Sequence, residues 1–364
     1  MSATTTPTAS GAFGAETGRG PARAVGLWLL GCCAMVLAMA VIGAITRLTE
    51  SGLSIMEWAP ISGVLPPLSQ AEWQRLFDLY RQIPQFSQVN AGMDLEAFKT
   101  IFWWEYVHRL WGRLIGAAFL LPLVWFWRRG RIDRPLAGKL LLVLALGGAQ
   151  GLLGWFMVAS GFADRTDVSQ YRLTAHLALA LIIYGYLLWL ALGVLWPRPE
   201  RSRDGAALPL RRALWALLAL VAVTIASGGF VAGLNAGFTY NTFPLMDGEI
   251  VPRGYADLSP WIANLFENVA AVQFNHRLLA VTTVILAFVL WVWSLSRDLA
   301  PSAQVGFAAL AILALIQLAL GITTLLLVVP VTLGALHQAG AVLVLTATIW
   351  TLYHLRGRPE LAKR

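Results

Sequence analysis

The sequence predicts an all-α integral membrane protein whose eight transmembrane helices form two tandem four-helix bundles related by internal duplication. Three observations predict this fold. Hydrophobic residues make up 58% of the 364 residues and charged residues only 13%, where a soluble domain carries about 25% charged residues. The apolar residues gather in eight runs of roughly the 20 residues that cross a bilayer. Motifs in the first half of the chain recur in the second half.

Each apolar run is predicted to be one membrane-spanning helix. The runs cover approximately residues 25–45, 108–127, 138–159, 174–195, 211–234, 273–295, 304–328 and 332–353. Lys and Arg cluster in 128–139, 198–212 and 355–364, which lie on one side if every run crosses once. Cytoplasmic segments of membrane proteins carry such an excess, so both termini are predicted to be cytoplasmic. The net charge of +8 is therefore read as a topology signal, and no nucleic-acid partner is expected.

The predicted organisation follows from these runs. It comprises a disordered cytoplasmic N-terminus (1–24), an N-terminal bundle (25–196) with a long external loop (46–107), a cytoplasmic linker (197–212), a C-terminal bundle (213–355) and a cytoplasmic tail (356–364). In the external loop, Ser69 and Glu72 have the spacing of a capping box. Apolar residues then recur at helical spacing from Trp73 to Tyr80, and Asp94 can cap a helix that continues into the second run.

Four matches indicate that the halves are repeats. Residues 45–60 loosely resemble 230–246, each following the first run of its half. "EYVHRLWGRLIG" opens the second run and "QFNHRLLAVTTV" the sixth, so that His108 and His276 are 168 residues apart. "QGLLG" in the third run and "QLALG" in the seventh are 167 residues apart. His176 and His337, in the fourth and eighth runs, are 161 residues apart. Four matches, three of them at nearly one offset, favour a duplication.

Histidines mark one end of every even-numbered run. A lone histidine in a membrane helix is usually a structural hydrogen-bonding group, but four at the same depth in two repeated pairs favour ligation. A zinc site would need four close ligands, whereas the repeat implies two separate pairs, His108 with His176 and His276 with His337. Two imidazoles facing each other across a helical bundle suit a haem iron, and small residues near the ligands leave room for the ring. Two haem sites near the outer face are therefore predicted.

Other polar residues have weaker assignments. Arg109 and Arg277 follow the leading histidines and could pair with haem propionates or extend to the membrane surface; Arg113 and Arg47 are further candidates. His354 is interpreted as a solvated tail residue. Cys32 and Cys33 are neighbours in the first run, where their side chains point about 100° apart. They are not expected to form a disulfide, and they receive no role.

Glu105 breaks the symmetry between the halves. It precedes His108 by three residues and so shares a helix face with it, whereas Gln273 takes the same place before His276. A group that accepts protons beside one ring, and its neutral isostere beside the other, suggest that the first half performs chemistry on its haem and the second holds a permanent one. The alternative is a Glu105–Arg109 ion pair at the water boundary, which contributes little.

Five motifs resemble heme A synthases of the proteobacterial and mitochondrial type. They are "TRLTESGLSIMEWAPISGVLPPL" (46–68), "FKTIFWWEYVHRLWGRLIG" (98–116), "TAHL" (174–177), "FNHRLLA" (274–280) and "LHQAGA" (336–341). Some other bacterial members of that family carry cysteine pairs in their external loops, and this chain has none there. The resemblance extends over about residues 25–355.

The resemblance implies an oxidoreductase that converts heme O to heme A for cytochrome c oxidase. A ring methyl would become a formyl group by successive hydroxylations. His276 and His337 would bind a resident heme b, His108 and His176 the substrate, and Glu105 would be the catalytic acid or base. The family also implies the inner membrane of a bacterium, haem sites toward the periplasmic face, and heme O synthase and oxidase assembly factors as partners. A homo-oligomer stays open.

Two alternative functions use the same ligands. A bis-histidine membrane cytochrome would carry electrons between a quinol and an outer partner. A haem carrier would load and release a haem without catalysis. The difference between Glu105 and Gln273, and the long loop before His108, favour the enzyme.

Overall fold

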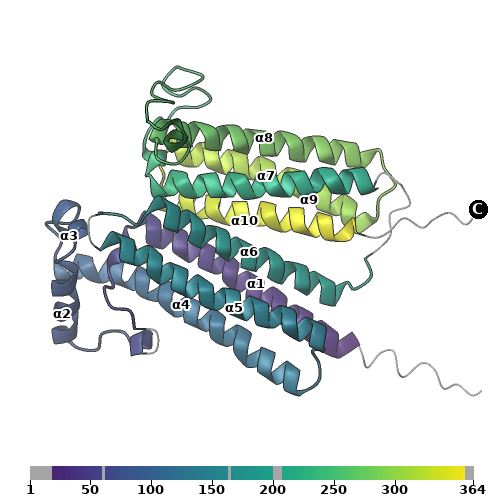
Figure 1. Cartoon of the computed structure of the whole chain (residues 1–364), viewed down its shortest axis with the longest axis horizontal. Helices are drawn as coiled ribbons and strands as arrows, with labels where there is room; N and C mark the ends of the chain where they lie inside the picture. The colour runs from purple at the N-terminus through teal and green to yellow at the C-terminus, as the bar shows by residue number, and fades with distance from the viewer. Residues whose placement is uncertain (1–18, 60–61, 163–164, 200–206, 357–364) are drawn as a thin grey trace, which may run out of the picture.

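The structure, a computed structural model, describes residues 19–59, 62–162, 165–199 and 207–356 (Figure 1). Within these ranges all regular structure is helical, apart from a single bridge between Met246 and Glu249. The predicted disorder of residues 1–18 and most of the predicted linker and tail lie outside the described residues.

Within the described ranges, eight helices are long and apolar enough to cross a membrane, which confirms that part of the predicted fold. They are α1 (Arg19–Leu48), α4 (Leu95–Arg128), α5 (Arg134–Val158), α6 (Gln170–Leu195), α7 (Ala207–Gly233), α8 (Val269–Leu295), α9 (Pro301–Leu326) and α10 (Val331–His354). The predicted runs fall within or close to these helices. The main difference is at their ends, because α1 begins six residues before the predicted run and α4 thirteen.

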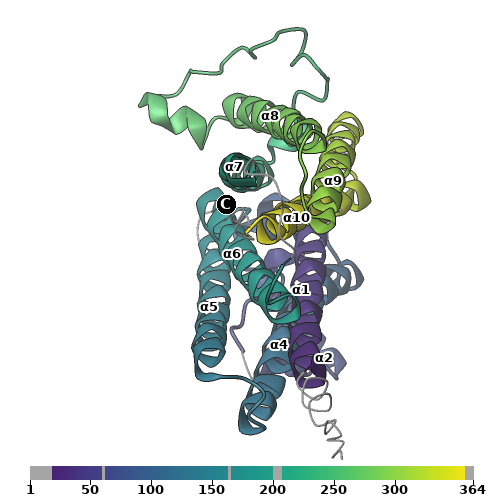
Figure 2. The same ribbon diagram turned by 90° about the vertical axis from the view of Figure 1, so that its right-hand side faces the viewer.

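The eight helices form two groups side by side. Helices α1, α4, α5 and α6 make one group, and α7 to α10 make the other (Figures 1 and 2). Helix α6 packs against α7, and α1 packs against α10. Fully buried leucines of both groups belong to one apolar cluster, among them Leu29 of α1, Leu187 of α6 and Leu217 of α7. The two groups therefore share one continuous apolar core.

The segment between α1 and α4 folds into short helices at one end of the first group. These are η1 (Ser51–Leu53), η2 (Ser62–Val64), α2 (Gln70–Tyr80) and α3 (Pro84–Gln88). The Ser69 side chain accepts a hydrogen bond from the backbone of Glu72 and so caps α2, as predicted. Its predicted apolar face, from Trp73 to Tyr80, is buried.

Helix α4 is one continuous helix of 34 residues, which begins well before the apolar run. Asp94 caps its first turn through a hydrogen bond from Ala97 N, as the sequence predicted. The early turns of α4 pack against α2, η1 and the turn between α5 and α6. We call this the outer cluster: Leu53, Trp73, Leu76, Phe77, Tyr80, Ile83, Phe98, Ile101, Phe102, Tyr106 and Val168. The cluster covers the end of the first helix group.

The second group carries a shorter external segment between α7 and α8. It contains η4 (Ala236–Phe238) and η5 (Trp261–Leu265). Asn235, just before η4, has φ 54° and ψ 24°. Glu50, just before η1, has φ 54° and ψ 26°. After both α1 and α7, the chain thus passes through one residue in the left-handed conformation and then forms a short 3₁₀ helix.

Arg47 joins the two groups at this end of the molecule. Its Nη2 donates to Asp167 Oδ2 at 3.4 Å, to Ala232 O at 3.1 Å and to Asn235 Oδ1 at 2.9 Å. The Asn235 amide also donates to Asp167, at 2.8 Å. Arg47 and Asp167 belong to the first group, and Ala232 and Asn235 to the second. These polar contacts stabilise the contact between the groups.

Replacing Arg47 by Ala should lower the stability of the folded protein by about 1–3 kcal/mol, since hydrogen bonds to a charged group are lost and Asp167 is left without its cation. Thermal unfolding of detergent-purified protein measures this. Arg253→Ala is the control, because the Arg253 side chain is 91% exposed where it pairs with Glu249, and pairs of that kind contribute little. Equal midpoints for both variants would show that Arg47 does not hold the groups together.

The structure corrects one sequence interpretation. His354 is 3% exposed and is not a solvated tail residue. It is the last residue of α10, and its ring packs against Trp196 and Trp350 at centroid distances of 6.0 and 4.5 Å. The neighbouring basic residues suggested solvent, but the aromatic residues at the ends of α6 and α10 close over it. Cys32 and Cys33 are free thiols, as predicted, and both are buried.

Candidate functional site

The four predicted ligands lie on α4, α6, α8 and α10 and are partly buried. His276 and His337 face each other with ring centroids 6.5 Å apart and ring planes at 83°. The structure therefore brings His276 and His337 together, as the repeat predicts. Among the described residues, no group of three or more His, Cys, Asp or Glu side chains could hold a metal ion.

The spacing of His276 and His337 suits an ion between them. An imidazole nitrogen binds a metal ion at about 2 Å, and its ring centroid lies roughly 1 Å further back, so two opposed rings sit roughly 6 Å apart. The observed 6.5 Å is close to this value. The side-chain contacts of His176, His276 and His337 are made by their Nδ1 atoms, which leaves Nε2 for an ion. The residues present thus fit axial ligation of a haem iron.

Three of the histidines have a polar partner on the other ring nitrogen. Ser227 Oγ lies 2.8 Å from His276 Nδ1. Gln150 Nε2 lies 3.2 Å from His176 Nδ1 and donates to the backbone oxygen of that histidine at 2.9 Å. Gln317 makes the same pair of contacts to His337, at 3.1 and 2.8 Å. Partners of this kind fix the orientation of a ligating ring.

A glycine on the preceding helix faces each histidine ring. A Cβ on the glycine would lie 3.2 Å from Cε1 of His108, 3.0 Å from that of His176, 3.0 Å from that of His276 and 2.8 Å from that of His337. The glycines, in the same order, are Gly43 of α1, Gly154 of α5, Gly228 of α7 and Gly321 of α9. Each ring therefore occupies space that a side chain on the neighbouring helix would need.

Replacing Gly321 by Ala should displace His337 and lower the haem content of the purified protein several-fold, because the new methyl group would sit 2.8 Å from the ring. The haem absorbance per mole of protein measures this. Gly151→Ala is the control, since no atom lies within 4 Å of a Cβ at that helical position. Full haem content in Gly321→Ala would mean that the ring can move aside freely.

Glu105 is 3% exposed and has a complete set of hydrogen-bond donors. Its Oε2 accepts from Ser54 Oγ at 2.8 Å and from Ile55 N at 2.7 Å. Its Oε1 accepts from Arg109 Nε at 2.9 Å and Nη2 at 2.6 Å. The ion pair with Arg109 exists, but inside the protein and not at an exposed water boundary. Glu105 thus ties α4 to the loop after η1.

Gln273 occupies the equivalent place with the opposite hydrogen-bonding role. It is 2% exposed, and its Nε2 donates to Ala236 O at 2.7 Å and to Thr239 O at 2.6 Å. Its Oε1 accepts from Arg277 Nη2 at 2.7 Å. The first half therefore presents donors to a carboxylate, where the second presents carbonyl oxygens to an amide.

The two following arginines bind the loops in the same way. Arg109 donates to Ile55 O at 2.6 Å and to Glu57 O at 2.8 Å. Arg277 donates to Tyr240 O at 2.6 Å and to Thr242 O at 2.7 Å.

The other two arginines also bind backbone oxygens: Arg113 binds Ala59 O at 2.8 Å, and Arg47 holds the inter-group contact described above. These contacts show a loop-anchoring role for the arginines; propionate binding by Arg47, Arg109, Arg113 and Arg277 stays a prediction.

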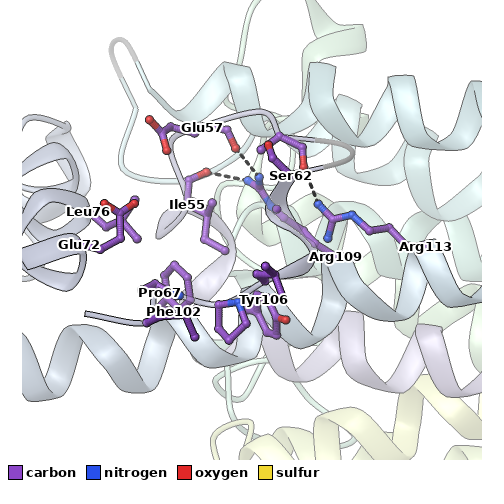
Figure 3. A pocket seen from close by; sticks show the side chains of 15 residues that line it. Ile55, Glu57, Ser62, Pro67, Glu72, Leu76, Phe102, Tyr106, Arg109 and Arg113 are labelled. Carbon is purple, nitrogen blue, oxygen red and sulfur yellow. Dashed lines mark hydrogen bonds between the residues drawn. The ribbon is translucent and has the colours of Figure 1, made fainter. Parts of the chain in front are cut away.

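A cavity of about 270 Å³ lies between the outer loop and α4. Arg109 and Arg113 extend from α4 toward the loop that carries Ile55 and Glu57, and Tyr106 lies beside them (Figure 3). None of the four histidines lines this cavity. Glu57, which also lines the cavity, has its pKa lowered by hydrogen bonds from Arg75, so it stays ionised at neutral pH.

Sequence reasoning missed several of these residues. Gln150 and Gln317 were recognised as repeated residues, but not as partners of the histidines. Ser227 was not singled out because the first half has no serine at the equivalent place. Glycines on the ligand helices were expected to make room, whereas the closest approaches to the rings come from glycines on the neighbouring helices. Gly154 and Gly321 each follow a repeated glutamine by four residues. This repeated spacing was the signal that could have identified them.

Comparisons with known proteins identify relatives over nearly the whole chain. Residues 26–349 match the family model described as "Cytochrome oxidase assembly protein". The chain is 51% identical over 332 residues to "Heme A synthase" of Nitrosospira multiformis, which covers 91% of this chain and 93% of that protein. It is 52% identical over 348 residues to "Heme A synthase" of Rhodospirillum centenum, covering 95% and 92%. The protein of that name from Paramagnetospirillum magneticum is 48% identical over 355 residues, covering 96% and 99%.

Proposed function

The chain belongs to the cytochrome oxidase assembly protein family, and we propose that it performs the reaction of the heme A synthases in that family. It is an enzyme of the oxidoreductase class that acts on heme O and yields heme A, and it is a multi-pass membrane protein of a bacterium. The observation that carries this function is the identity of about half of all residues over more than nine-tenths of the chain.

The two helix groups are proposed to be duplicated halves, residues 25–196 and 213–355. The supporting observation is that the same contacts occur in both. A left-handed residue follows the first helix of each half, and Arg109 and Arg277 each bind two loop carbonyls and the side chain one turn earlier. A glutamine holds the second histidine of each pair.

We assign the first half to the substrate and the second to a resident heme b. His108 and His176 would hold heme O, and His276 and His337 would hold the resident group. When bound, the resident haem supplies one-electron redox chemistry. Converting a methyl group to a formyl group with water as the oxygen source releases electrons, two in each oxidation step, and one proton for every electron. The site therefore needs both an electron outlet and a proton acceptor.

Glu105 is the proposed proton acceptor. It lies one turn from His108 on α4, and Ser54, Ile55 and Arg109 fix the direction of its carboxylate. A positioned carboxylate can take a proton from the reacting methyl group or from the attacking water. Gln273 cannot accept a proton in the same way, which suits a half that only carries electrons. The outer cluster shields the adjacent end of the bundle from bulk water.

The proposed membrane orientation has both termini in the cytoplasm and both histidine pairs toward the periplasmic face. The basic clusters at one end of the helices support this, as does the position of the histidines near the opposite ends. Heme O synthase and oxidase assembly factors are proposed partners within the plasma membrane.

Expression in a bacterium that makes heme O but lacks heme A tests the function. Extracted pigments should contain heme A when the chain is present, and only heme O when it is absent. A membrane cytochrome or a haem carrier would leave heme O unchanged. Recovery of spectrally intact haem protein from cells that contain no heme A would therefore overturn the enzymatic proposal.

A further inference from the structure

The four histidines differ in what supports them. His176, His276 and His337 each have a polar side chain next to Nδ1. His108 Nδ1 is buried and has no hydrogen-bond partner among the residues that the structure describes. We propose that Ser227 positions His276 as a permanent ligand, and that His108, which lacks such a residue, is the ligand that lets the substrate exchange. This inference rests on the proposed function.

Ser227 Oγ can fix which nitrogen of His276 carries the proton. It lies 2.7 Å from Thr224 O and 2.8 Å from His276 Nδ1, and its single hydrogen can point to only one of them. When Ser227 donates to Thr224 O, it accepts from Nδ1–H, which leaves the lone pair of Nε2 for iron. An acceptor on Nδ1–H also fixes the ring and raises the basicity of Nε2, so it strengthens the bond to a metal.

Gln150 and Gln317 hold their histidines through a different contact. Each amide places its Nε2 atom against both the Nδ1 atom and the backbone oxygen of its histidine, and it donates to that oxygen. These glutamines therefore position the ring through its backbone and its edge, whereas Ser227 can also act as an acceptor toward Nδ1.

The residue equivalent to Ser227 in the first half is Ile42. The two glycines that follow them meet their histidines with nearly the same geometry. A Cβ on Gly43 would lie 3.2 Å from Cε1 and 3.7 Å from Nδ1 of His108; on Gly228 the distances to His276 are 3.0 and 3.6 Å. Ile42 and Ser227 immediately precede these glycines. The first half therefore places an aliphatic side chain where the second places an acceptor.

This difference divides the work between the two sites. The resident site has a supported ligand on each face of the iron, whereas the substrate site has a supported His176 on one face and an unsupported His108 on the other. Because the bond to His108 is the weaker, the substrate can enter and leave through its rupture while His176 stays in place. His108 also lies one turn from Glu105, so the exchangeable ligand and the proposed proton acceptor share one helix.

Dissociation of iron protoporphyrin IX from the purified full-length protein to excess apomyoglobin tests the proposal. The wild type should release one haem fast and one slowly. Ser227→Ala should accelerate the slow phase by about 10–100-fold, the usual effect of losing a residue that orients a ligand, and Ser227→Thr, which keeps the hydroxyl, should restore it. Ile42→Ser should slow the fast phase about 10-fold relative to Ile42→Ala, which makes the same space without an acceptor.

Equal fast phases in Ile42→Ser and Ile42→Ala, or an unchanged slow phase in Ser227→Ala, would overturn the proposal. Slower haem release from the variants that carry a hydroxyl group at position 42 or 227 would support the proposal even if the chain made no heme A, because haem release is measured without turnover. Absence of heme A together with these phases would instead count against the proposed function alone.

Discussion

Glu105→Gln is expected to abolish heme A formation, reducing the yield by about 100-fold or more, while the protein still binds haem. The amide has nearly the shape of the carboxylate but cannot take up a proton. Pigments extracted from cells that express the variant should show heme O or a hydroxylated intermediate in place of heme A. Removing a general base typically lowers a rate by about 10²–10⁴-fold.

Glu105→Gln should also weaken the contacts of this side chain, and that structural effect must be separated from the loss of the proton acceptor. Ile55 N and Arg109 both donate to this side chain, so an amide there would turn its own N–H toward one donor and lose a hydrogen bond. Such a loss costs about 1–3 kcal/mol. Ser54→Ala is the matched control, since it removes one donor to Glu105 but keeps the carboxylate. It should weaken the loop contact and retain substantial activity.

Normal heme A formation by Glu105→Gln would refute the catalytic assignment. Equal inactivity of Ser54→Ala and Glu105→Gln would show that the loop contact, and not proton transfer, is what the reaction needs.

His276→Ala is expected to remove the resident haem from the purified protein, whereas His108→Ala should keep it. Each variant loses one ligand of one pair only, and the two pairs belong to different helix groups. The absorbance of the reduced protein as purified, scaled to protein concentration, measures resident haem. His108→Ala should also stop heme A formation, because its substrate ligand is gone.

His354→Ala serves as the control for loss of a histidine from the same chain. It removes a buried ring at the opposite end of α10 from His337, so any fall in haem content should be smaller than in His276→Ala. Loss of the absorbance in both His276→Ala and His108→Ala would show that the two pairs do not form independent sites.

The sequence was sufficient for the membrane helices and for bringing His276 and His337 together. Hydropathy located the eight helices, since the cost of burying backbone and charge in lipid leaves few other arrangements. The pairing followed from the repeat, because His108 and His276 open equivalent helices. Local signals also placed Ser69 and Asp94 correctly as helix caps, since a cap depends on residues only three positions away.

Contacts between distant segments could not be predicted in this way. The partners of Glu105 are Ser54 and Ile55, about 50 residues earlier in the chain, and nothing local shows that η1 returns to α4. The glutamine partners were visible as repeats, but their reach depends on how α5 packs on α6. The search for repeats passed over Ser227 because it has no serine counterpart. His354 was misjudged because its charged neighbours in sequence are not its neighbours in space.

The outer cluster restricts the route by which a tetrapyrrole can enter and leave the first helix group. Its aromatic side chains join α2 to the early turns of α4, and α4 continues unbroken into the membrane. This end of the first helix group can open only if these aromatic contacts break. A bulky tetrapyrrole would therefore be expected to arrive and depart sideways, between helices that border the lipid, and its supply would depend on what is dissolved in the bilayer rather than on what diffuses in the surrounding water.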